Sequence, residues 1–127
     1  MRVEAQRLIK QAERDLKNAR KNIGVGAHEA AAFLAEQSVE KYLEAAWTVV
    51  KREAAPRTHS LTELGDGLGV PAERRRHLVS LNADYTTARC PDAANGVPYE
   101  VYDRETAEAK VRAAEEVLAW LRPLTNV

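Results

Sequence analysis

The chain has 127 residues, one cysteine, and 19 basic against 19 acidic side chains, so its net charge is zero. This length suits a single domain over residues 1–127 that buries its own core, and one cysteine excludes an internal disulfide. No apolar run approaches the roughly 20 residues of a membrane span and no leader pattern is present, which favours a reduced, cytoplasmic protein. Abundant alanine and few aromatic residues are typical of an all-α protein.

The first predicted helix covers residues 2–21, where apolar side chains recur at three- and four-residue intervals. Residues 1–22 carry seven basic and three acidic side chains, whereas residues 92–116 carry three basic and seven acidic ones. Two interpretations stay open: the end helices attract each other across the bundle, or the basic face meets an anionic partner. That face consists of Arg7, Lys10, Arg14, Lys17 and Lys21.

The longest predicted helix covers residues 27–52 and extends about 39 Å at 1.5 Å per residue. Its apolar stripe and additional aromatic side chains make it the expected central helix. Polar side chains on this helix are therefore expected to be wholly or partly enclosed, and enclosed charges need partners. These side chains are Glu36, Gln37, Glu40, Lys41 and Glu44.

Proline and helix-capping residues mark where helices begin and end in the second half of the chain. Ser60 and Glu63 form a capping box, which predicts a short helix over residues 60–66. A fourth longer helix is expected from Pro71 until Pro91, because proline suits a first helical turn and ends a preceding helix. Residues 90–102 are expected to form a loop, after which Asp103 caps the last helix. The sequence thus predicts four longer helices, one short helix and no strand.

A second basic cluster begins the fourth helix, where three arginines precede His77. The helix dipole opposes each positive charge there by roughly 0.3–1 kcal/mol, so something should compensate. A solvated face is one interpretation, and binding of phosphate is the other. The predicted phosphate or RNA surface consists of Arg74, Arg75, Arg76, Lys10, Arg14 and Lys17.

Metal and cofactor chemistry is not expected. The three histidines, His28, His59 and His77, are far apart, and none has a second ligand at metal-binding spacing. The glycines follow no predicted strand, and no phosphate-binding Gly-Lys-Ser/Thr pattern occurs. We therefore assign no metal ligand and no cofactor.

Two segments between the helices are expected to form a polar pocket with the central helix. His59 either bonds Glu40 or Glu36 as a structural histidine or offers its imidazole for proton transfer. Arg89 and Asp92 flank a turn that a proline forces, and we expect them to form an ion pair directed toward the central helix. The predicted pocket consists of Gln37, Glu40, Lys41, His59, Tyr85, Arg89 and Asp92.

Five segments follow one another along nearly the whole chain: DL (15–16), AAFLAEQSVEKYL (31–43), THSL (58–61), YTTARCPD (85–92) and EEVLAWL (115–121). In this combination they resemble the HEPN domain family of prokaryotes. The resemblance implies an up-and-down bundle of four longer helices plus a short one. It also implies a homodimer, or a higher even-numbered oligomer, that partners a separately encoded minimal nucleotidyltransferase in a toxin–antitoxin-type pair.

Many members of that family are metal-independent ribonucleases, whose motif places an arginine and, a few residues later, a histidine at one helix end. Arg89 occupies the family's arginine position, with Cys90 in place of the usual tyrosine, but no histidine follows it. Arg52 and His59 have a matching spacing, although Pro56 lies between them. We therefore expect a nucleotide- or RNA-binding subunit that is not itself an enzyme.

Two alternatives stay open. The first is a metal-independent endoribonuclease in which Arg89 and His59 are the catalytic residues. The second is a sensor that binds a small molecule or a nucleotide in the same polar pocket.

Overall fold

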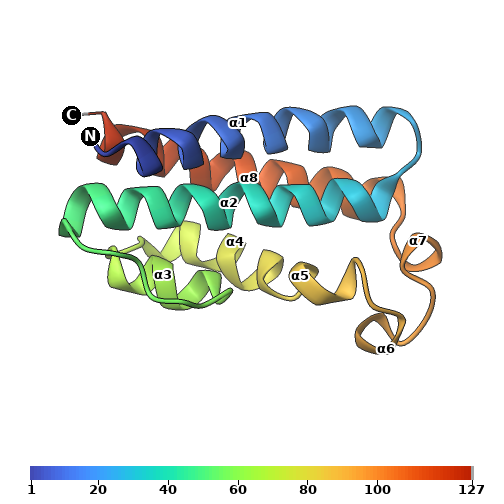
Figure 1. Ribbon diagram of the computed structural model, residues 1–127. Coiled ribbons are helices and arrows are strands. Elements are labelled where there is room, and N and C mark those ends of the chain that lie inside the picture. The colour runs from blue at the N-terminus through green and yellow to red at the C-terminus, as the bar shows by residue number, and fades with distance from the viewer. Residues whose placement is uncertain (127) are drawn as a thin grey trace.

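The protein forms an all-α bundle, and the computed structural model describes residues 1–126 (Figure 1). The four longer helices are α1 (Val3–Gly24), α2 (His28–Lys51), α4 (Ala72–Asn82) and α8 (Arg104–Thr125). A short helix, α3 (Leu61–Gly67), and three single turns, α5 (Asp84–Thr87), α6 (Pro91–Ala94) and α7 (Pro98–Val101), complete the described chain. The predicted up-and-down bundle of four longer helices plus a short one is confirmed.

Helix α2 is the central element, as its apolar stripe predicts. It packs against α1 and α8, and on the opposite side against α3 and α5 (Figure 1). Small side chains let the long helices approach closely, and each fully buried leucine between them contributes about 1.5–3 kcal/mol by leaving water. The fully buried alanines include Ala12, Ala35, Ala46 and Ala114, and the leucines include Leu43, Leu64, Leu78, Leu118 and Leu121.

The serine and aspartate caps expected from the sequence are present, but the capping box is only half formed, because the backbone N–H of Ser60 donates to Thr58 Oγ1 at 3.0 Å and not to Glu63. Ser60 Oγ accepts a hydrogen bond from the backbone N–H of Glu63 at 3.2 Å, and Asp103 Oδ1 accepts one from that of Thr106 at 2.7 Å. Each bond satisfies a donor that the first helical turn leaves without a partner inside the helix. The bond from Thr106 also lowers the pKa of the Asp103 carboxyl. Helices α3 and α8 therefore begin where their capping residues predict.

The fourth predicted helix is interrupted, which corrects the expectation of one continuous helix. Helix α4 ends at Asn82, whose side-chain Oδ1 accepts a hydrogen bond from the backbone N–H of Leu61 at 2.8 Å. This bond ties the end of α4 to the start of α3. After Ala83 the chain resumes in α5, where Asp84 is buried and Tyr85 is half-buried. The interruption thus decides which way the side chains of Asp84 and Tyr85 point.

The segment expected as a loop contains two single helical turns. Helices α6 and α7 begin at Pro91 and Pro98, whose fixed φ suits the first helical position. Asn95 ends α6 with a φ of 53°, a left-handed conformation that asparagine adopts more readily than most residues. The two turns carry the chain from the end of α5 to the start of α8, so Tyr102 comes to lie beside α5.

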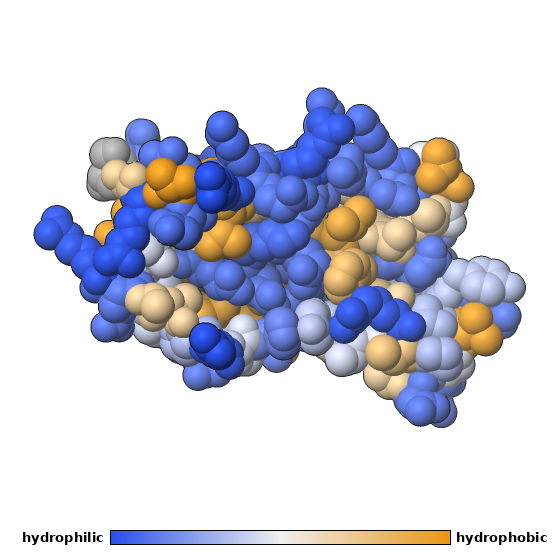
Figure 2. All heavy atoms as spheres, in the orientation of Figure 1, coloured by the Kyte–Doolittle hydropathy of each residue, from blue (hydrophilic) through white to orange (hydrophobic). Residues whose placement is uncertain are grey.

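The surface is mainly hydrophilic on the face seen in Figure 2, with separate apolar patches. Three large apolar side chains, those of Val97, Tyr99 and Val101, are exposed within one short segment around α7. In the described part of the chain, no helix has both the length and the apolar character that crossing a membrane requires.

Candidate functional site

Three aromatic rings and one cation are stacked at the surface beside α2. The rings of His59 and Tyr85 lie nearly parallel, with centroids 4.0 Å apart and an angle of 17° between them. Arg89 Cζ lies 4.4 Å from the centre of the Tyr85 ring and 5.0 Å from that of Phe33. The His59 side chain is 58% exposed, and Arg89 is exposed as well. We call these four residues the stacked surface.

Four separate parts of the chain supply this stacked surface. Phe33 comes from α2, His59 from the connection between α2 and α3, Tyr85 from α5, and Arg89 from the turn after α5. Arg89 Nε donates a hydrogen bond to the backbone carbonyl of Tyr85 at 2.7 Å, one helical turn earlier. This bond holds the guanidinium against the ring, where a cation–π contact contributes about 0.5–1 kcal/mol at an exposed site.

Three carboxyl groups lie behind the stacked surface, and we call them the carboxylate cluster. Glu36 and Glu40 are one turn apart on α2, Asp84 comes from α5, and their residues are 0%, 6% and 2% exposed. His59 Nδ1 lies 3.0 Å from Glu40 Oε1, and the side-chain amide of Gln37 donates to Glu36 Oε1 at 2.8 Å. His59 therefore joins the cluster to the exposed stack.

The third carboxyl group, that of Asp84, has one partner in α8 and another just before it. The hydroxyl of Tyr102 donates to Asp84 Oδ1 at 2.5 Å, and Lys110 Nζ forms an ion pair with Asp84 Oδ2 at 3.0 Å. Burial raises the pKa of Asp84, although both partners act in the opposite direction. Burial and the neighbouring carboxylate likewise raise the pKa of the Tyr102 phenol. Asp84 thus fastens α5 to the beginning of α8.

Glu36 has the most strongly altered acid–base chemistry. Burial raises its pKa from the ordinary 4.5 to about 8; the hydrogen bond from Gln37 opposes this shift, and the charges of Glu40 and Asp84 add to it. Glu36 is therefore mostly protonated at neutral pH. Strongly shifted carboxyl groups of this kind gather at functional sites more often than elsewhere.

The structure gathers most of the predicted pocket. Gln37, Glu40, His59, Tyr85 and Arg89 come together in the stacked surface and the carboxylate cluster. The two catalytic candidates, His59 and Arg89, both lie against the ring of Tyr85. They approach each other within one chain, although they are 30 residues apart in the sequence.

Two predicted pocket residues lie elsewhere. Lys41 Nζ pairs with Asp15 of α1 at 2.5 Å, so it faces away from α5 and neutralises a buried acid on the other side of α2. Asp92 is exposed on α6, and among the described residues it forms no ion pair with Arg89. The predicted Arg89–Asp92 pair is wrong, because two aromatic rings and a backbone carbonyl already hold the guanidinium.

The predicted phosphate surface is not one surface. Arg74 pairs with Glu116 of α8 at 3.5 Å, Arg75 forms two hydrogen bonds with Asp66 at 2.8 and 3.0 Å, and Arg76 bonds a backbone carbonyl. Burial lowers the pKa of the neighbouring His77, and Arg76 adds to this shift. The charges of the α4 arginines are therefore largely compensated.

The basic face of α1 remains exposed. Lys10, Arg14 and Lys17 have no ion-pair partner among residues 1–126, whereas Arg20 pairs with Glu115 of α8 at 3.3 Å. Together with the pair of Arg74 and Glu116, this places acidic residues of α8 between the bases of α1 and those of α4. The attraction expected between the two end helices is present in such pairs.

Two cavities in the described part of the chain have predicted site residues in their walls. The first, about 600 Å³, has His59 in its wall together with Arg2, Arg57 and Glu44, and burial raises the pKa of Glu44. It extends the candidate site toward the start of α1. In the described chain no group of three His, Cys, Asp or Glu side chains is arranged to hold a metal ion.

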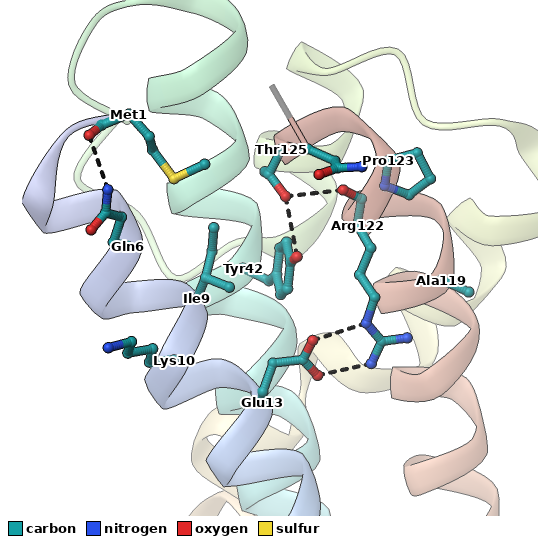
Figure 3. A pocket seen from close by; sticks show the side chains of 11 residues that line it. Met1, Gln6, Ile9, Lys10, Glu13, Tyr42, Ala119, Arg122, Pro123 and Thr125 are labelled. Carbon is teal, nitrogen blue, oxygen red and sulfur yellow. Dashed lines mark hydrogen bonds and ion pairs between the residues drawn. The ribbon is translucent and has the colours of Figure 1, made fainter.

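The second cavity, about 860 Å³, opens between the start of α1 and the end of α8 (Figure 3). Two charged groups in its wall, Arg122 and Glu13, already pair with each other through two hydrogen bonds of 2.8 and 2.9 Å. The hydrogen bond from Arg122 also lowers the pKa of the Glu13 carboxyl. At its base Tyr42 bonds the hydroxyl of Thr125 at 3.1 Å. Of the predicted site residues this cavity contains only Lys10. The stacked surface, with the smaller cavity beside His59, is therefore the better functional candidate.

Several members of the site were not predicted: Phe33, Asp84, Tyr102 and Lys110. A signal for Asp84 was available, because Leu81, Asp84 and Ala88 are spaced by three and four residues and share one helical face. A carboxylate on such an apolar face requires a partner. Nothing local identifies Tyr102 and Lys110 as those partners, since they are 18 and 26 residues further along the chain.

The fold and this site define a class of protein: a small helical bundle with a polar seam along its central helix. The sequence model of the HEPN domain matches residues 5–124, and the chain belongs to the HEPN domain family.

Two solved structures are similar over nearly the whole chain. The protein TT1696 from Thermus thermophilus is 26% identical, with a TM-score of 0.86 over 95% of this chain and 98% of that one. ST0689, described as an archaeal HEPN homologue, is 32% identical, with a TM-score of 0.84 over 99% of this chain and 100% of that one. Among curated proteins there is no match.

Proposed function

We propose that this HEPN protein binds a nucleotide or single-stranded RNA as the partner of a separately encoded minimal nucleotidyltransferase, in a toxin–antitoxin-type pair. The stacked surface is the observation that carries the proposal. The exposed imidazole of His59, supported from behind by the ring of Tyr85, offers a face for a base, and a base stacked on an aromatic side chain gains about 1–3 kcal/mol. Arg89 adds a cation with several donors, which suits a phosphate.

The carboxylate cluster restricts where such a ligand lies. Glu40 and Asp84 are buried and already have their own partners, His59, Tyr102 and Lys110, so they offer no donor to a phosphate. An anionic ligand therefore stays on the outer side of His59 and Arg89. The cavity beside His59 has two further cations, Arg2 and Arg57, in its wall. A short single strand therefore has a cationic path that begins at Arg89 and continues past His59.

Binding is tested by fluorescence anisotropy with a labelled oligoribonucleotide of about six nucleotides. Tyr85→Ala removes the ring on which His59 is stacked, and we expect it to weaken binding roughly 5- to 150-fold, the equivalent of one stacked base. Arg89→Ala should weaken it more than Arg76→Ala, which removes the same charge from α4. Equal losses from the two arginine variants would contradict the proposed site. Binding of mononucleotides without RNA would instead favour the sensor.

The proposed assembly is a homodimer, or a higher even-numbered oligomer, joined by the nucleotidyltransferase. Three exposed apolar side chains around α7, those of Val97, Tyr99 and Val101, support an assembly role, because apolar patches often mark protein contacts. The partner is sought by co-expression with a nucleotidyltransferase encoded beside this gene. Absence of such a neighbour, together with failure of any nucleotidyltransferase to co-purify, would reject the partnership while leaving RNA binding open.

A metal-independent endoribonuclease is the second candidate, favoured by the approach of His59 and Arg89 to one ring. In this reaction the imidazole takes the proton of a 2′-hydroxyl, whose oxygen bonds to phosphorus as the bond to the 5′ oxygen breaks. The departing 5′ oxygen takes a proton from water. Arg89 would stabilise the charge that develops on the phosphoryl oxygens.

Cleavage by the purified protein in the presence of a chelator, abolished by His59→Ala and by Arg89→Ala, would establish the enzyme. Intact RNA after incubation with the protein free of its partner would reject it.

A further inference from the structure

Glu36 holds a polar atom that lacks a hydrogen-bond partner. Its residue is 0% exposed; Oε1 accepts from Gln37, but within residues 1–126 nothing donates to Oε2. A buried carboxylate oxygen without a donor costs several kcal/mol, so a partner is expected. The simplest partner is a proton on Glu36 itself, which turns the unpaired acceptor into a donor.

Glu40 is the acceptor for that proton. It lies one turn along α2, at the four-residue spacing that brings two side chains of a helix together, and both residues are buried. Two adjacent buried carboxyl groups resist ionising together, and they share one proton readily. Glu40 then accepts from Glu36 on one side and from His59 Nδ1, at 3.0 Å, on the other.

No cation competes for Glu36 within the described residues. Two cations of the elements around the cluster already have partners: Lys110 of α8 pairs with Asp84, and Lys41 of α2 itself pairs with Asp15 of α1. The other titratable or charged groups around the cluster are Glu44 of α2, Tyr85 of α5, Arg89 after α5 and Tyr102 before α8.

We propose that Glu36, Glu40 and His59 form a hydrogen-bonded triad. Glu36 donates its proton to Glu40, and Glu40 accepts the Nδ1–H of His59. The unprotonated Nε2 of the imidazole is thereby presented at the exposed surface beside Tyr85 and Arg89. Glu36 and Glu40 act as positioning residues, because the hydrogen bond at one ring nitrogen decides the state of the other.

The triad gives the stacked surface a defined hydrogen-bond acceptor beside the cation of Arg89. Nε2 is placed to accept from a hydroxyl or N–H of a bound ligand, or to take its proton. This use of Nε2 rests on the proposed function, whereas the triad itself is tested on the free protein.

The test is the tautomer of His59, read from the ring nitrogen shifts of protein labelled with ¹⁵N-histidine. The wild type is expected to carry the proton on Nδ1. In Glu40→Gln the amide oxygen accepts the hydrogen bond from protonated Glu36 and the amide N–H faces His59, so the tautomer should change to Nε2–H. His28 and His77 serve as references in the same spectrum, and neither should change.

Comparison of Glu36→Gln with Glu36→Ala tests whether Glu36 acts as a hydrogen-bond donor or only fills space. The amide N–H of the new glutamine still donates to Glu40, so the Nδ1–H tautomer should persist, whereas Glu36→Ala should reduce its share. A carboxylic acid carbonyl band in the infrared spectrum at neutral pH should also disappear in Glu36→Gln.

Three results would overturn the triad: a proton on Nε2 in the wild type, the same tautomer in Glu40→Gln, or no infrared band that depends on Glu36. Melting curves of each variant confirm that the compared proteins are folded. Since no ligand is present, such a result leaves the RNA-binding measurement unaffected. Conversely, a confirmed triad without RNA binding would reject only the proposed function.

Discussion

The two faces of helix α2 bury opposite kinds of side chain. Toward α1 and α8 the helix presents alanine and aliphatic groups, and a polar side chain there, Ser38, donates to the backbone carbonyl of Ala12 at 2.8 Å. Toward α5 it buries Glu36 and Glu40 opposite Asp84. Burial of apolar area stabilises the fold, whereas burial of carboxyl groups costs free energy that hydrogen bonds only partly offset. One helix thus supplies stability on one face and a reactive environment on the other.

The apolar face of α2 should give the largest loss of stability. Leu43 is fully buried in the core, and Leu43→Ala removes its contacts and leaves a cavity. We expect the free energy of unfolding to fall by about 2–5 kcal/mol in chemical denaturation. RNA binding by the folded variant should stay close to that of the wild type. A loss below about 1 kcal/mol would mean that the core collapses around the gap.

The contact of α3 with α2 should give the next effect. A Cβ added at Gly67 would lie 2.1 Å from the ring of Trp47, so the ring or the helix must move. Gly67→Ala is expected to cost about 1–3 kcal/mol, measured by thermal unfolding. The matched control is Gly24→Ala, because a Cβ there meets nothing within 4 Å. Similar melting temperatures for both variants would contradict this close packing.

The polar face of α2 should make the stability of the protein depend on pH. The pKa of Glu36 rises from 4.5 to about 8 on folding, so the folded state keeps a proton that the unfolded chain releases in this interval. The contribution of Glu36 to stability is therefore constant below about pH 4.5 and falls as the pH rises toward 8. Glu36→Gln should become progressively more stable relative to the wild type over that range. Parallel curves of melting temperature against pH would show that Glu36 does not titrate there.

The end of α2 should give the smallest effect. Arg52 terminates the helix in a left-handed conformation with φ 56° and ψ 35°, which disfavours residues that carry a Cβ. Arg52→Gly is expected to raise the free energy of unfolding by roughly 1 kcal/mol or less, since the entropy of glycine opposes the relief of strain. Denaturant titration measures this gain. A destabilised variant would indicate that the arginine side chain contributes more than its backbone costs.

Local patterns were sufficient to predict the long helices. Apolar spacing predicts α1, α2 and α8, and the capping residues Ser60 and Asp103 mark where α3 and α8 begin. The break after Asn82 was missed, because the bond from the N–H of Leu61 to its side chain joins residues 21 positions apart. A contact of that kind leaves no periodic trace in the sequence.

The candidate site could be predicted only in part for the same reason. An enclosed Glu40 needs a partner, and His59 was one of the few available, so their contact followed from charge and burial. The Arg89–Asp92 pair was wrong because proximity in sequence suggested it, whereas the guanidinium of Arg89 lies against the rings of Tyr85 and Phe33. Stacking between such distant residues depends on packing that no spacing pattern encodes.

The most direct test of the account is residue-resolved NMR of the ¹⁵N-labelled protein during titration with a short oligoribonucleotide. We expect the largest shift changes at Phe33, His59, Tyr85 and Arg89, and their loss in Tyr85→Ala. Changes centred on the basic face of α1, or on the cavity between α1 and α8, would contradict the central claim that the stacked surface is the binding site.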